Sequence, residues 1–407
     1  MRIIIDTQSN PLFQGSVLEQ AYGLRGGLCE GGKDDIVVVA NNFDKDYLKY
    51  WKGLGFDMPT ILVTQNGCPE LTLSQLIMRD NAVSKKLKAI ASRNGCARLE
   101  FFCIEESERQ LAEHLGIPAY CNFDFAFKFA KKPCFRRFCL QHNIPVVEGM
   151  CCKNLQEAEH FINGLHQRGI SALVKSESGT GGIACGGAVK IDPGDNIKAK
   201  LEGIKFIGQE FVVEKTIESV REEISIHWEV QFDGQIRVVG IQDQLAKNFG
   251  YSGVSMPSSI DPGEMAHLKK ILLGVLAPEM RNIGAIGFFS CDVILSPEEH
   301  WMDFNPRKGA AIYVRQMINR LQKKHFPDNQ LFIWHEHNKV SDTISFEKVR
   351  KVLGSLIVPG HDSKRLIVIT NSGVMPYGYL DITAISTVSR EDARGHFEKA
   401  KNLILCQ

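Results

Sequence analysis

A short acidic stretch near residue 300 has the residue types and spacing for metal and phosphate chemistry. Asp303, Asn305 and Arg307 follow one another at intervals of two, so on a strand that continues through Arg307 their side chains share one face. Asp292 lies in the preceding apolar run, and residues 296–300 between the runs have the composition of a hairpin loop. We therefore expect Asp292 to lie beside Asp303. Carboxylate and amide oxygens suit Mg²⁺, and a neighbouring arginine suits a phosphoryl oxygen.

Two earlier stretches carry lysines where anions bind. Lys131 and Lys132 precede Pro133, a residue favoured at the first helical position, and a bound anion would relieve their repulsion with the positive helix N-terminus. Lys175 ends an apolar run and opens the glycine-rich stretch 176–187, where backbone amides can approach a phosphate. The stretch lacks the GKS or GKT of a Walker loop. The alternatives are solvent-exposed lysines and a flexible hairpin loop without a ligand.

Two glutamates lie at the ends of expected strands. Glu214 follows an apolar run, and residues 215–217 beyond it can offer backbone groups to an adenine edge while Glu214 accepts from the amino group. Glu223 begins another alternating run and can accept from ribose hydroxyls. The alternative for each glutamate is an ordinary solvated residue at a strand end.

The elements that must position these residues follow from apolar periodicity. We expect a parallel sheet with covering helices over the first 118 residues, since short apolar runs alternate there with helical patterns and no GxGxxG dinucleotide fingerprint is present. Later elements include a helix with a serine cap, a hairpin at Asp233-Gly234 and a final helix opened by a capping box at Ser389. The expected strands are 3–6, 35–40, 60–64, 99–104, 211–215, 223–232, 235–242 and 366–370, and the expected helices are 73–91, 107–115, 133–143, 264–282, 310–322 and 389–403.

Composition bounds the class of protein. The chain has 407 residues, 44% apolar and 23% charged, which is ordinary for a soluble globular protein with room for several structural units. A formal net charge of +1 gives no basic field for nucleic acid, and no apolar run approaches the length of a membrane span. The first strand turns polar too early for a signal peptide. The 12 cysteines are scattered without paired CxxC units, so we expect free thiols in a cytoplasmic protein with no nucleic-acid or membrane partner.

The motifs occur in an order that resembles the ATP-grasp superfamily. The matching stretches are 112–118, 132–145, 173–175 with its glycine loop, 212–217, 223–225, and 292 with 303–307. The resemblance implies an α/β ATP-grasp fold with α+β lobes. It places an N-terminal Rossmann-like pre-ATP-grasp domain at residues 1–118, an N-lobe with a glycine-rich lid at 119–213, a C-lobe with the magnesium site at 214–325, and a C-terminal extension at 326–407.

The same resemblance implies a role for each matching residue. Lys132 and Lys175 would hold the α- and β-phosphates of ATP, and Arg307 would steady an acyl phosphate, so Lys175 and Arg307 are the expected catalytic residues. The other matching residues would contact ATP or bind Mg²⁺, or alternatively Mn²⁺. They are Ser178, Gly181 and Gly182 of the lid, Glu214, Lys215 and Ile217 at adenine, Glu223 or Glu222 at ribose, and Asp292, Asp303 and Asn305 at the metal.

Two positions depart from the family pattern. Asp303 stands where the family usually has glutamate, so the metal geometry differs slightly. Ser290 stands where D-alanine:D-alanine ligases have an arginine, two positions before the metal-binding aspartate, which argues against that subfamily and gives Arg307 more weight.

The resemblance implies an ATP-dependent carboxylate–amine ligase that forms an amide or peptide bond through an acyl phosphate and releases ADP and phosphate. Small carboxylate and amine substrates, an amino acid or small peptide among them, are expected, with Gln244, Lys247 and Tyr251 lining the acceptor site unless 243–257 is an ordinary surface loop. The alternatives are a different acceptor (a polyamine, a thiol, a siderophore precursor or a protein side chain) and a non-catalytic nucleotide-binding module. Homodimers are common in the family, and the oligomeric state stays open.

Overall fold

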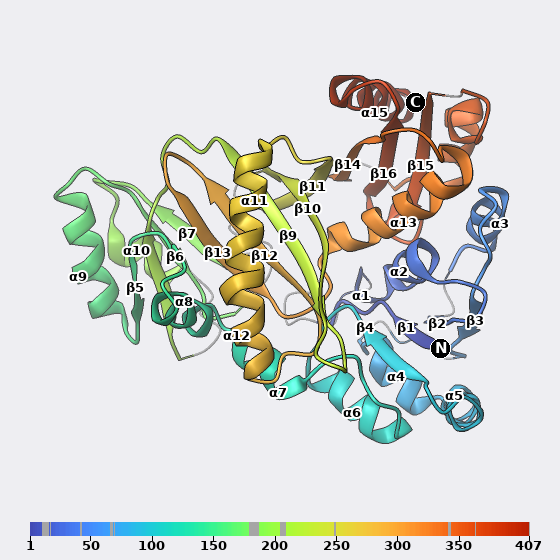
Figure 1. The fold of residues 1–407 in the computed structure, drawn as a ribbon, viewed down its shortest axis with the longest axis horizontal. Coiled ribbons are helices and arrows are strands. Elements are labelled where there is room, and N and C mark those ends of the chain that lie inside the picture. The colour runs from blue at the N-terminus through green and yellow to red at the C-terminus, as the bar shows by residue number, and fades with distance from the viewer. Residues whose placement is uncertain are drawn as a thin grey trace. The chain divides into compact units, whose positions relative to one another are not determined.

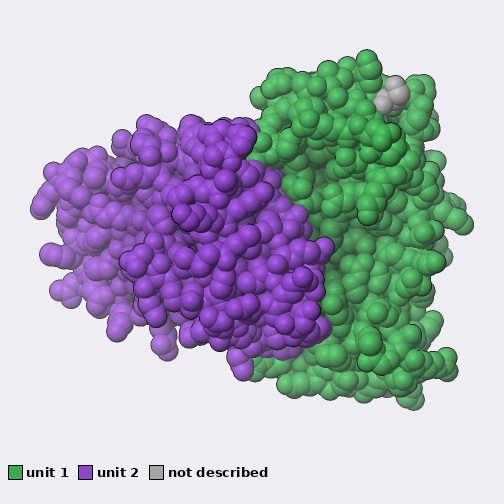
Figure 2. Space-filling view, viewed as in Figure 1, with its two compact units in different colours: residues 1–121, 252–258, 307–407 green, residues 122–251, 259–306 purple. Residues whose placement is uncertain are grey.

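The computed structural model describes residues 1–9, 16, 18–40, 43–65, 68, 70–178, 187–203, 209–247, 250–340, 343–362 and 364–406. Over these residues the chain forms two compact units, coloured separately in Figure 2. Unit 1 holds residues 1–121, 252–258 and 307–407, and unit 2 holds residues 122–251 and 259–306. Gly181 and Gly182 of the expected lid lie outside the described residues. None of the described helices has the length and apolar character needed to cross a bilayer.

Unit 1 opens with the parallel sheet that the alternating pattern predicts. The four strands pair in the order β3-β2-β1-β4, and each pairs in parallel with its neighbours. Their apolar side chains are buried because helices cover the sheet, so the strands are short runs without polar alternation. The elements are β1 (Arg2–Ile5), α1 (Leu18–Ala21), α2 (Gly23–Glu30), β2 (Ile36–Val39), α3 (Lys45–Gly53), β3 (Thr60–Val63), α4 (Leu73–Arg79), α5 (Asn81–Arg93), β4 (Arg98–Phe101) and α6 (Glu106–Leu115).

Two helix predictions in this part of the chain are wrong in detail. The expected single helix 73–91 is interrupted at Asp80, whose backbone is extended and whose carboxylate accepts from the amides of Ala82 and Val83. Asp80 therefore ends α4 and caps α5. The expected serine cap of α6 is also wrong, because the capping residue is Glu105, paired with Glu108 in a capping box.

The C-terminal part of unit 1 is a second layer of strands. The strands β11 (Gly250–Met256), β14 (Phe332–Lys339), β16 (Tyr379–Ser386) and β15 (Arg365–Asn371) lie side by side in that order. β14 is antiparallel to β11 and β16, and β15 is antiparallel to β16. The strand expected at 366–370 is β15, whereas β14 and β16 were not predicted. The elements are α13 (Ala310–His325), β14 (Phe332–Lys339), α14 (Phe346–Leu353), the 3-10 turns at Gly354–Ile357 and Met375–Tyr377, β15 (Arg365–Asn371), β16 (Tyr379–Ser386) and α15 (Arg390–Leu405).

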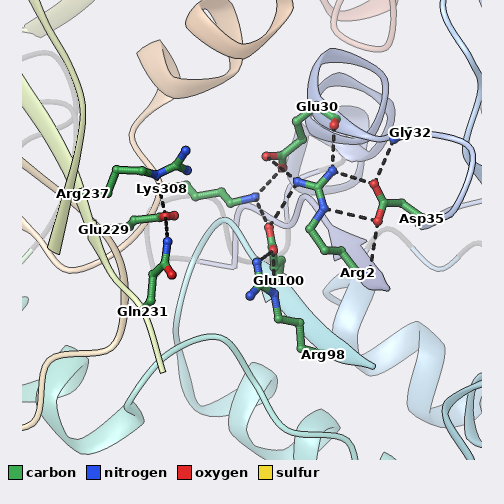
Figure 3. A network of polar contacts seen from close by, with 10 residues as sticks. All are labelled: Arg2, Glu30, Gly32, Asp35, Arg98, Glu100, Glu229, Gln231, Arg237 and Lys308. Atoms are coloured by element: carbon green, nitrogen blue, oxygen red, sulfur yellow. Dashed lines mark hydrogen bonds and ion pairs between the residues drawn. The ribbon is translucent and has the colours of Figure 1, made fainter. Parts of the chain in front are cut away.

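A network of charges ties Lys308, just before α13, to the N-terminal part of unit 1 (Figure 3). The side chain of Lys308 is 2% exposed, and its Nζ lies 2.9 Å from Glu100 Oε2 on β4 and contacts Glu30 at the end of α2. Arg2 on β1 pairs with Asp35 at 2.6 Å and also lies near both glutamates. The beginning of the C-terminal stretch is therefore tied by charge to the N-terminal sheet.

Unit 2 contains a small antiparallel sheet in the order β5-β8-β6-β7. Its strands are β5 (Gly149–Cys152), β6 (Ala172–Lys175), β7 (Ala188–Ile191) and β8 (Phe211–Lys215), and α9 (Leu155–His166) and α10 (Ile197–Glu202) pack their apolar residues against it. Lys175 is the last residue of β6 and Glu214 is the fourth residue of β8, so this sheet positions two of the expected site residues.

The second sheet of unit 2 has the order β13-β12-β9-β10. On β9, Ile224, Ile226 and Trp228 are buried in a core shared with the helices α11 and α12, which run along these strands in Figure 1. The expected helix 264–282 is α11 (Pro262–Ile271), a π turn at Leu272–Leu276 and α12 (Ala277–Asn282) in succession. The remaining elements are α7 (Phe123–Phe129), α8 (Lys132–Gln141), β9 (Glu222–Val230), β10 (Ile236–Lys247), β12 (Gly287–Leu295) and β13 (Glu299–Asn305).

The alternative that residues 243–257 form an ordinary surface loop is wrong. β10 runs to Lys247 and β11 begins at Gly250, so Gln244 and Lys247 lie on one strand and Tyr251 near the start of the next. Strand pairing, rather than loop flexibility, positions the proposed acceptor residues.

Candidate functional site

The acidic hairpin has the register expected from its sequence. β12 and β13 are antiparallel, and Asp292 pairs directly with Asp303. A register shift follows, because Val293 pairs with Trp301, and Met302 is the extra residue of a bulge. Asp303 and Asn305 are two positions apart on the strand and therefore share a face with Asp292.

The position of Arg307 differs from the expectation. β13 ends at Asn305, so the strand does not continue to Arg307, and the condition under which Arg307 would share the face of Asp303 is not met. Arg307 belongs to unit 1, where its guanidinium lies 5.0 Å from the centre of the Phe102 ring and donates to the carbonyl of Lys308. Its role at an acyl phosphate stays a prediction.

The two expected phosphate lysines converge on Asp303. Lys132 is the first residue of α8, and its Nζ lies 3.1 Å from Asp303 Oδ1. The Nζ of Lys175 lies 3.6 Å from the same oxygen. Burial raises the pKa of Asp303, but the two ammonium groups outweigh burial and hold that pKa well below its usual range. Burial lowers the pKa of Lys175, but the charges of Asp303 and Glu214 raise this pKa by more than burial lowers it. The lysine therefore stays charged.

The lysine pair at the start of α8 is divided between two partners. Lys132 faces Asp303, whereas Lys131, whose side chain is 47% exposed, lies 3.3 Å from Glu177. The backbone amide of Lys132 also donates to the carbonyl of Glu177 at 2.8 Å, which holds the first turn of α8 beside the end of β6. Neither lysine simply extends into solvent, so that alternative is wrong.

Glu214 is buried between two cations. Its Oε1 accepts from Arg136 at 3.0 Å, and its Oε2 lies 3.0 Å from Lys175. Both carboxylate oxygens face cations, so the contact of this side chain with an adenine amino group stays a prediction. Lys215 ends β8 and Ile217 lies just beyond it. Sequence reasoning did not identify Arg136 as a site residue, although its position one helical turn after Lys132 places both on one face of α8.

Strand β9 presents a polar face to Asp292. Ser225 pairs in register with Asp292, and its hydroxyl donates to Asp292 Oδ1 at 3.2 Å. His227 Nε2 lies 2.9 Å from Ser225 Oγ. Burial, followed by the charge of Asp303, raises the pKa of Asp292 to about 7. The alternation of polar residues along β9 was the sequence signal for Ser225 and His227, which were not identified.

The same alternation separates the two candidate ribose residues. Glu223 lies two positions before Ser225 and therefore shares the face of Asp292, whereas Glu222 points to the opposite face. Burial raises the pKa of Glu223. Of the lid residues, Ser178 is described, and its carbonyl accepts from the Ser176 hydroxyl at 2.9 Å.

The donor set on this face fits a hard divalent cation. Among the described residues no three His, Cys, Asp or Glu side chains converge as a preformed metal centre. The face instead offers two carboxylates and the amide of Asn305. Mg²⁺ commonly takes one or two carboxylates and completes its shell with phosphate oxygens and water. A cation here would also relieve the repulsion that raises the pKa of Asp292.

Comparisons with known proteins bear on the fold of the chain. Residues 28–117 match the family model for the pre ATP-grasp domain, and no curated protein sequence matches the chain. The chain is similar in structure to N5-carboxyaminoimidazole synthetase from Staphylococcus aureus complexed with ADP, with a TM-score of 0.61 and 13% identity, covering 98% of this chain and 96% of that chain.

Two further solved structures are similar over nearly the whole chain. N5-carboxyaminoimidazole synthase from Aspergillus clavatus in complex with ADP and 5-aminoimidazole ribonucleotide has a TM-score of 0.60 and 12% identity, covering 99% of this chain and 98% of that one. The biotin carboxylase domain of Hydrogenobacter thermophilus 2-oxoglutarate carboxylase, with MgADP, ADP and bicarbonate, has a TM-score of 0.62 and 13% identity, covering 98% and 89%. The chain therefore has the ATP-grasp fold with an N-terminal pre-ATP-grasp domain, and the resemblance seen in its sequence motifs is confirmed at the level of the fold.

Proposed function

We propose that this protein is an ATP-dependent carboxylate–amine ligase that works through an acyl phosphate. The observation that carries the proposal is the convergence of Lys132, Lys175 and Asp292 on Asp303, from four separate elements of unit 2. Positive groups for phosphates beside oxygen donors for a cation are what phosphoryl transfer needs. The similar structures that hold ADP or MgADP support the nucleotide assignment.

The proposed reaction has two steps. A substrate carboxylate attacks the γ-phosphorus of ATP, so that a carboxylate oxygen–phosphorus bond forms, the bond to the β,γ-bridging oxygen breaks and ADP leaves. An amine then attacks the acyl carbon and inorganic phosphate leaves as the nitrogen loses its proton. Mg²⁺, or Mn²⁺, held by Asp292, Asp303 and Asn305 would neutralise phosphate charge.

The residues of this chain supply positioning and charge rather than a covalent nucleophile. Lys132 and Lys175 bind the α- and β-phosphates, and their ion pairs with Asp303 keep both ammonium groups aimed at one point before nucleotide arrives. The backbone at Lys215 and Ile217 binds adenine, and Glu223 accepts from ribose. Ser178, Gly181 and Gly182 belong to the lid that excludes water, and Arg307 steadies the acyl phosphate.

An amino acid or small peptide is the proposed substrate, with Gln244, Lys247 and Tyr251 near the acceptor. A second candidate is bicarbonate as the carboxylate donor. The similarity of fold to a biotin carboxylase domain with bicarbonate favours this second candidate.

The test is ADP release measured against pooled amino acids, pooled small carboxylic acids, and bicarbonate with small amines, followed by mass spectrometry of the product. We expect one pool to stimulate ADP release in the wild type and not in Asp303→Ala or Asn305→Ala. Near-normal turnover in either variant would refute the metal assignment. Tight nucleotide binding without stimulated ADP release by any pool would favour a non-catalytic nucleotide-binding module.

A further inference from the structure

A line of three hydrogen-bonded side chains leads from the interior of unit 2 to the candidate metal face. His227 and Ser225 are 1% and 4% exposed, and both lie on the polar face of β9. His227 Nε2 contacts Ser225 Oγ at 2.9 Å, and Ser225 Oγ contacts Asp292 Oδ1 at 3.2 Å. Burying a polar side chain costs free energy unless it is hydrogen-bonded, so two buried polar residues on one face of β9 call for an explanation.

The direction of these hydrogen bonds follows from counting protons. Asp292 must be ionised to act as a ligand of a cation, and an ionised carboxylate only accepts hydrogen bonds. The Ser225 hydroxyl has one proton, which it donates to Asp292 Oδ1. The Ser225 oxygen must therefore accept from His227, so His227 carries its proton on Nε2. The relay runs from His227 through Ser225 to Oδ1 of Asp292, and each donor orients the next acceptor.

Strand register makes the relay rigid. Ser225 and Asp292 are direct partners on β9 and β12, and Asp292 and Asp303 are direct partners on β12 and β13. Ser225, Asp292 and Asp303 thus form one row across the three strands. With Oδ1 of Asp292 held by Ser225, rotation of the carboxylate is restricted and its second oxygen has a fixed orientation on the face shared with Asp303.

We propose that Ser225 and His227 are positioning residues that orient the Asp292 carboxylate and thereby set the affinity of the site for divalent cation with nucleotide. The inference rests on the proposed function, since it takes Asp292 as a metal ligand. Hydrogen bonds to metal-binding carboxylates generally change metal affinity by roughly 10–100-fold when they are removed.

The experiment measures binding of Mn²⁺ in the presence of saturating ADP, by loss of the free Mn²⁺ signal in electron paramagnetic resonance. We expect Ser225→Ala to raise the Kd for Mn²⁺ by roughly 10–100-fold. Ser225→Thr, which keeps the hydroxyl, should stay within about threefold of wild type. Binding of ADP in EDTA, measured by calorimetry, should be nearly the same in the wild type, Ser225→Ala and Ser225→Thr, since no metal takes part. This control excludes a merely structural defect, which would weaken the binding of ADP as well as that of Mn²⁺.

A second pair of variants tests the histidine. His227→Gln retains an amide donor at the position of Nε2, whereas His227→Leu removes it. We expect His227→Leu to weaken Mn²⁺ binding and His227→Gln to restore most of it. This pair also decides the matter if Ser225→Ala does not fold, as judged by near-ultraviolet circular dichroism.

The outcomes separate this inference from the proposed function. Asp292→Asn is the reference for loss of a ligand. If Asp292→Asn weakens Mn²⁺ binding but Ser225→Ala and His227→Leu do not, the positioning inference is overturned and the metal assignment stands. Wild-type Mn²⁺ affinity in Asp292→Asn itself overturns both.

Discussion

The two adjacent lysines at the start of α8 form ion pairs with different carboxylates. Lys132 lies 3.1 Å from Asp303, and Lys131 lies 3.3 Å from Glu177. The two neighbouring lysines therefore face different carboxylates, and Lys132 is the one that lies beside Asp303 of the candidate metal face.

This difference gives a paired prediction. Lys132→Met should raise the Kd for MgADP by roughly tenfold or more, because a charge-assisted hydrogen bond contributes about 1.5–3 kcal/mol. Lys131→Met should change the Kd by less than about threefold, since its side chain is half exposed and solvent screens its charge. Isothermal titration of both variants checks this, and equal losses would contradict the assignment of Lys132 to phosphate.

Glu19 in unit 1 gives a prediction about pH. Burial, together with the nearby charge of Glu108, raises the pKa of Glu19 to about 7, although Thr7 and the amide of Leu73 donate to it. The folded protein then holds a proton that the unfolded chain loses near pH 4.5, the ordinary value for this carboxyl. Stability should therefore fall as pH rises from about 4.5 to about 7, by roughly 3 kcal/mol from this group.

Glu19→Gln isolates that contribution. The amide keeps an acceptor for Thr7 and does not titrate. Urea unfolding of wild type and variant between pH 5 and 8 should show the variant gaining relative stability as pH rises. A difference in unfolding free energy that is independent of pH would show that Glu19 is already ionised in the folded state.

At the scale of elements, helix ends follow from side chains that compete with the backbone. Asp80 separates α4 from α5 because its carboxylate accepts from the amides of Ala82 and Val83, and also from Gln65 at 2.8 Å. Apolar periodicity runs through this point, which is why the sequence predicted one helix.

Asp80→Ala should lower the unfolding free energy by about 1–2 kcal/mol, the usual cost of losing a helix cap. Asp80→Asn keeps a capping oxygen and should lose less than half of that. Chemical denaturation of both variants is the measurement, and equal losses would show that the charge of Asp80, rather than its capping geometry, stabilises the junction.

Beyond single elements, buried ion pairs connect segments of unit 1 that lie far apart in the sequence. Lys308 is enclosed with Glu30 and Glu100. Arg2 approaches both carboxylates, and Arg98 pairs with Glu100 (Figure 3). Removing one member of such a group leaves buried charges without compensation, which is costly even where replacing the whole group would not be.

We predict that Lys308→Met lowers the unfolding free energy by about 3–5 kcal/mol. The control is Lys49→Met, which breaks an exposed pair with Asp46 and should cost less than about 0.5 kcal/mol. Adding Glu100→Gln to Lys308→Met should recover part of the loss, since it removes an uncompensated charge. Urea denaturation compares the variants, and a loss in Lys308→Met no larger than in Lys49→Met would contradict the prediction.

Features that depend on the spacing of apolar residues and on turn chemistry could be predicted from the amino-acid sequence. The parallel N-terminal sheet, the Asp233-Gly234 hairpin and the pairing of Asp292 with Asp303 could be predicted, because each needs only a short apolar pattern and a loop signal. The order of motifs then sufficed to predict the ATP-grasp fold.

The contacts between residues far apart in sequence could be seen only in the folded chain. No local pattern links Lys132 or Lys175 to Asp303, or Arg136 to Glu214, because these contacts depend on the path of the chain and on sheet register. The strands β14 and β16 were missed for a related reason. Buried polar residues such as His335 and Thr383, hydrogen-bonded to each other at 2.9 Å, make an interior strand resemble a polar surface segment in sequence. From the sequence alone a polar residue is assigned to the surface, because the hydrogen-bond partner that allows its burial is known only from the fold.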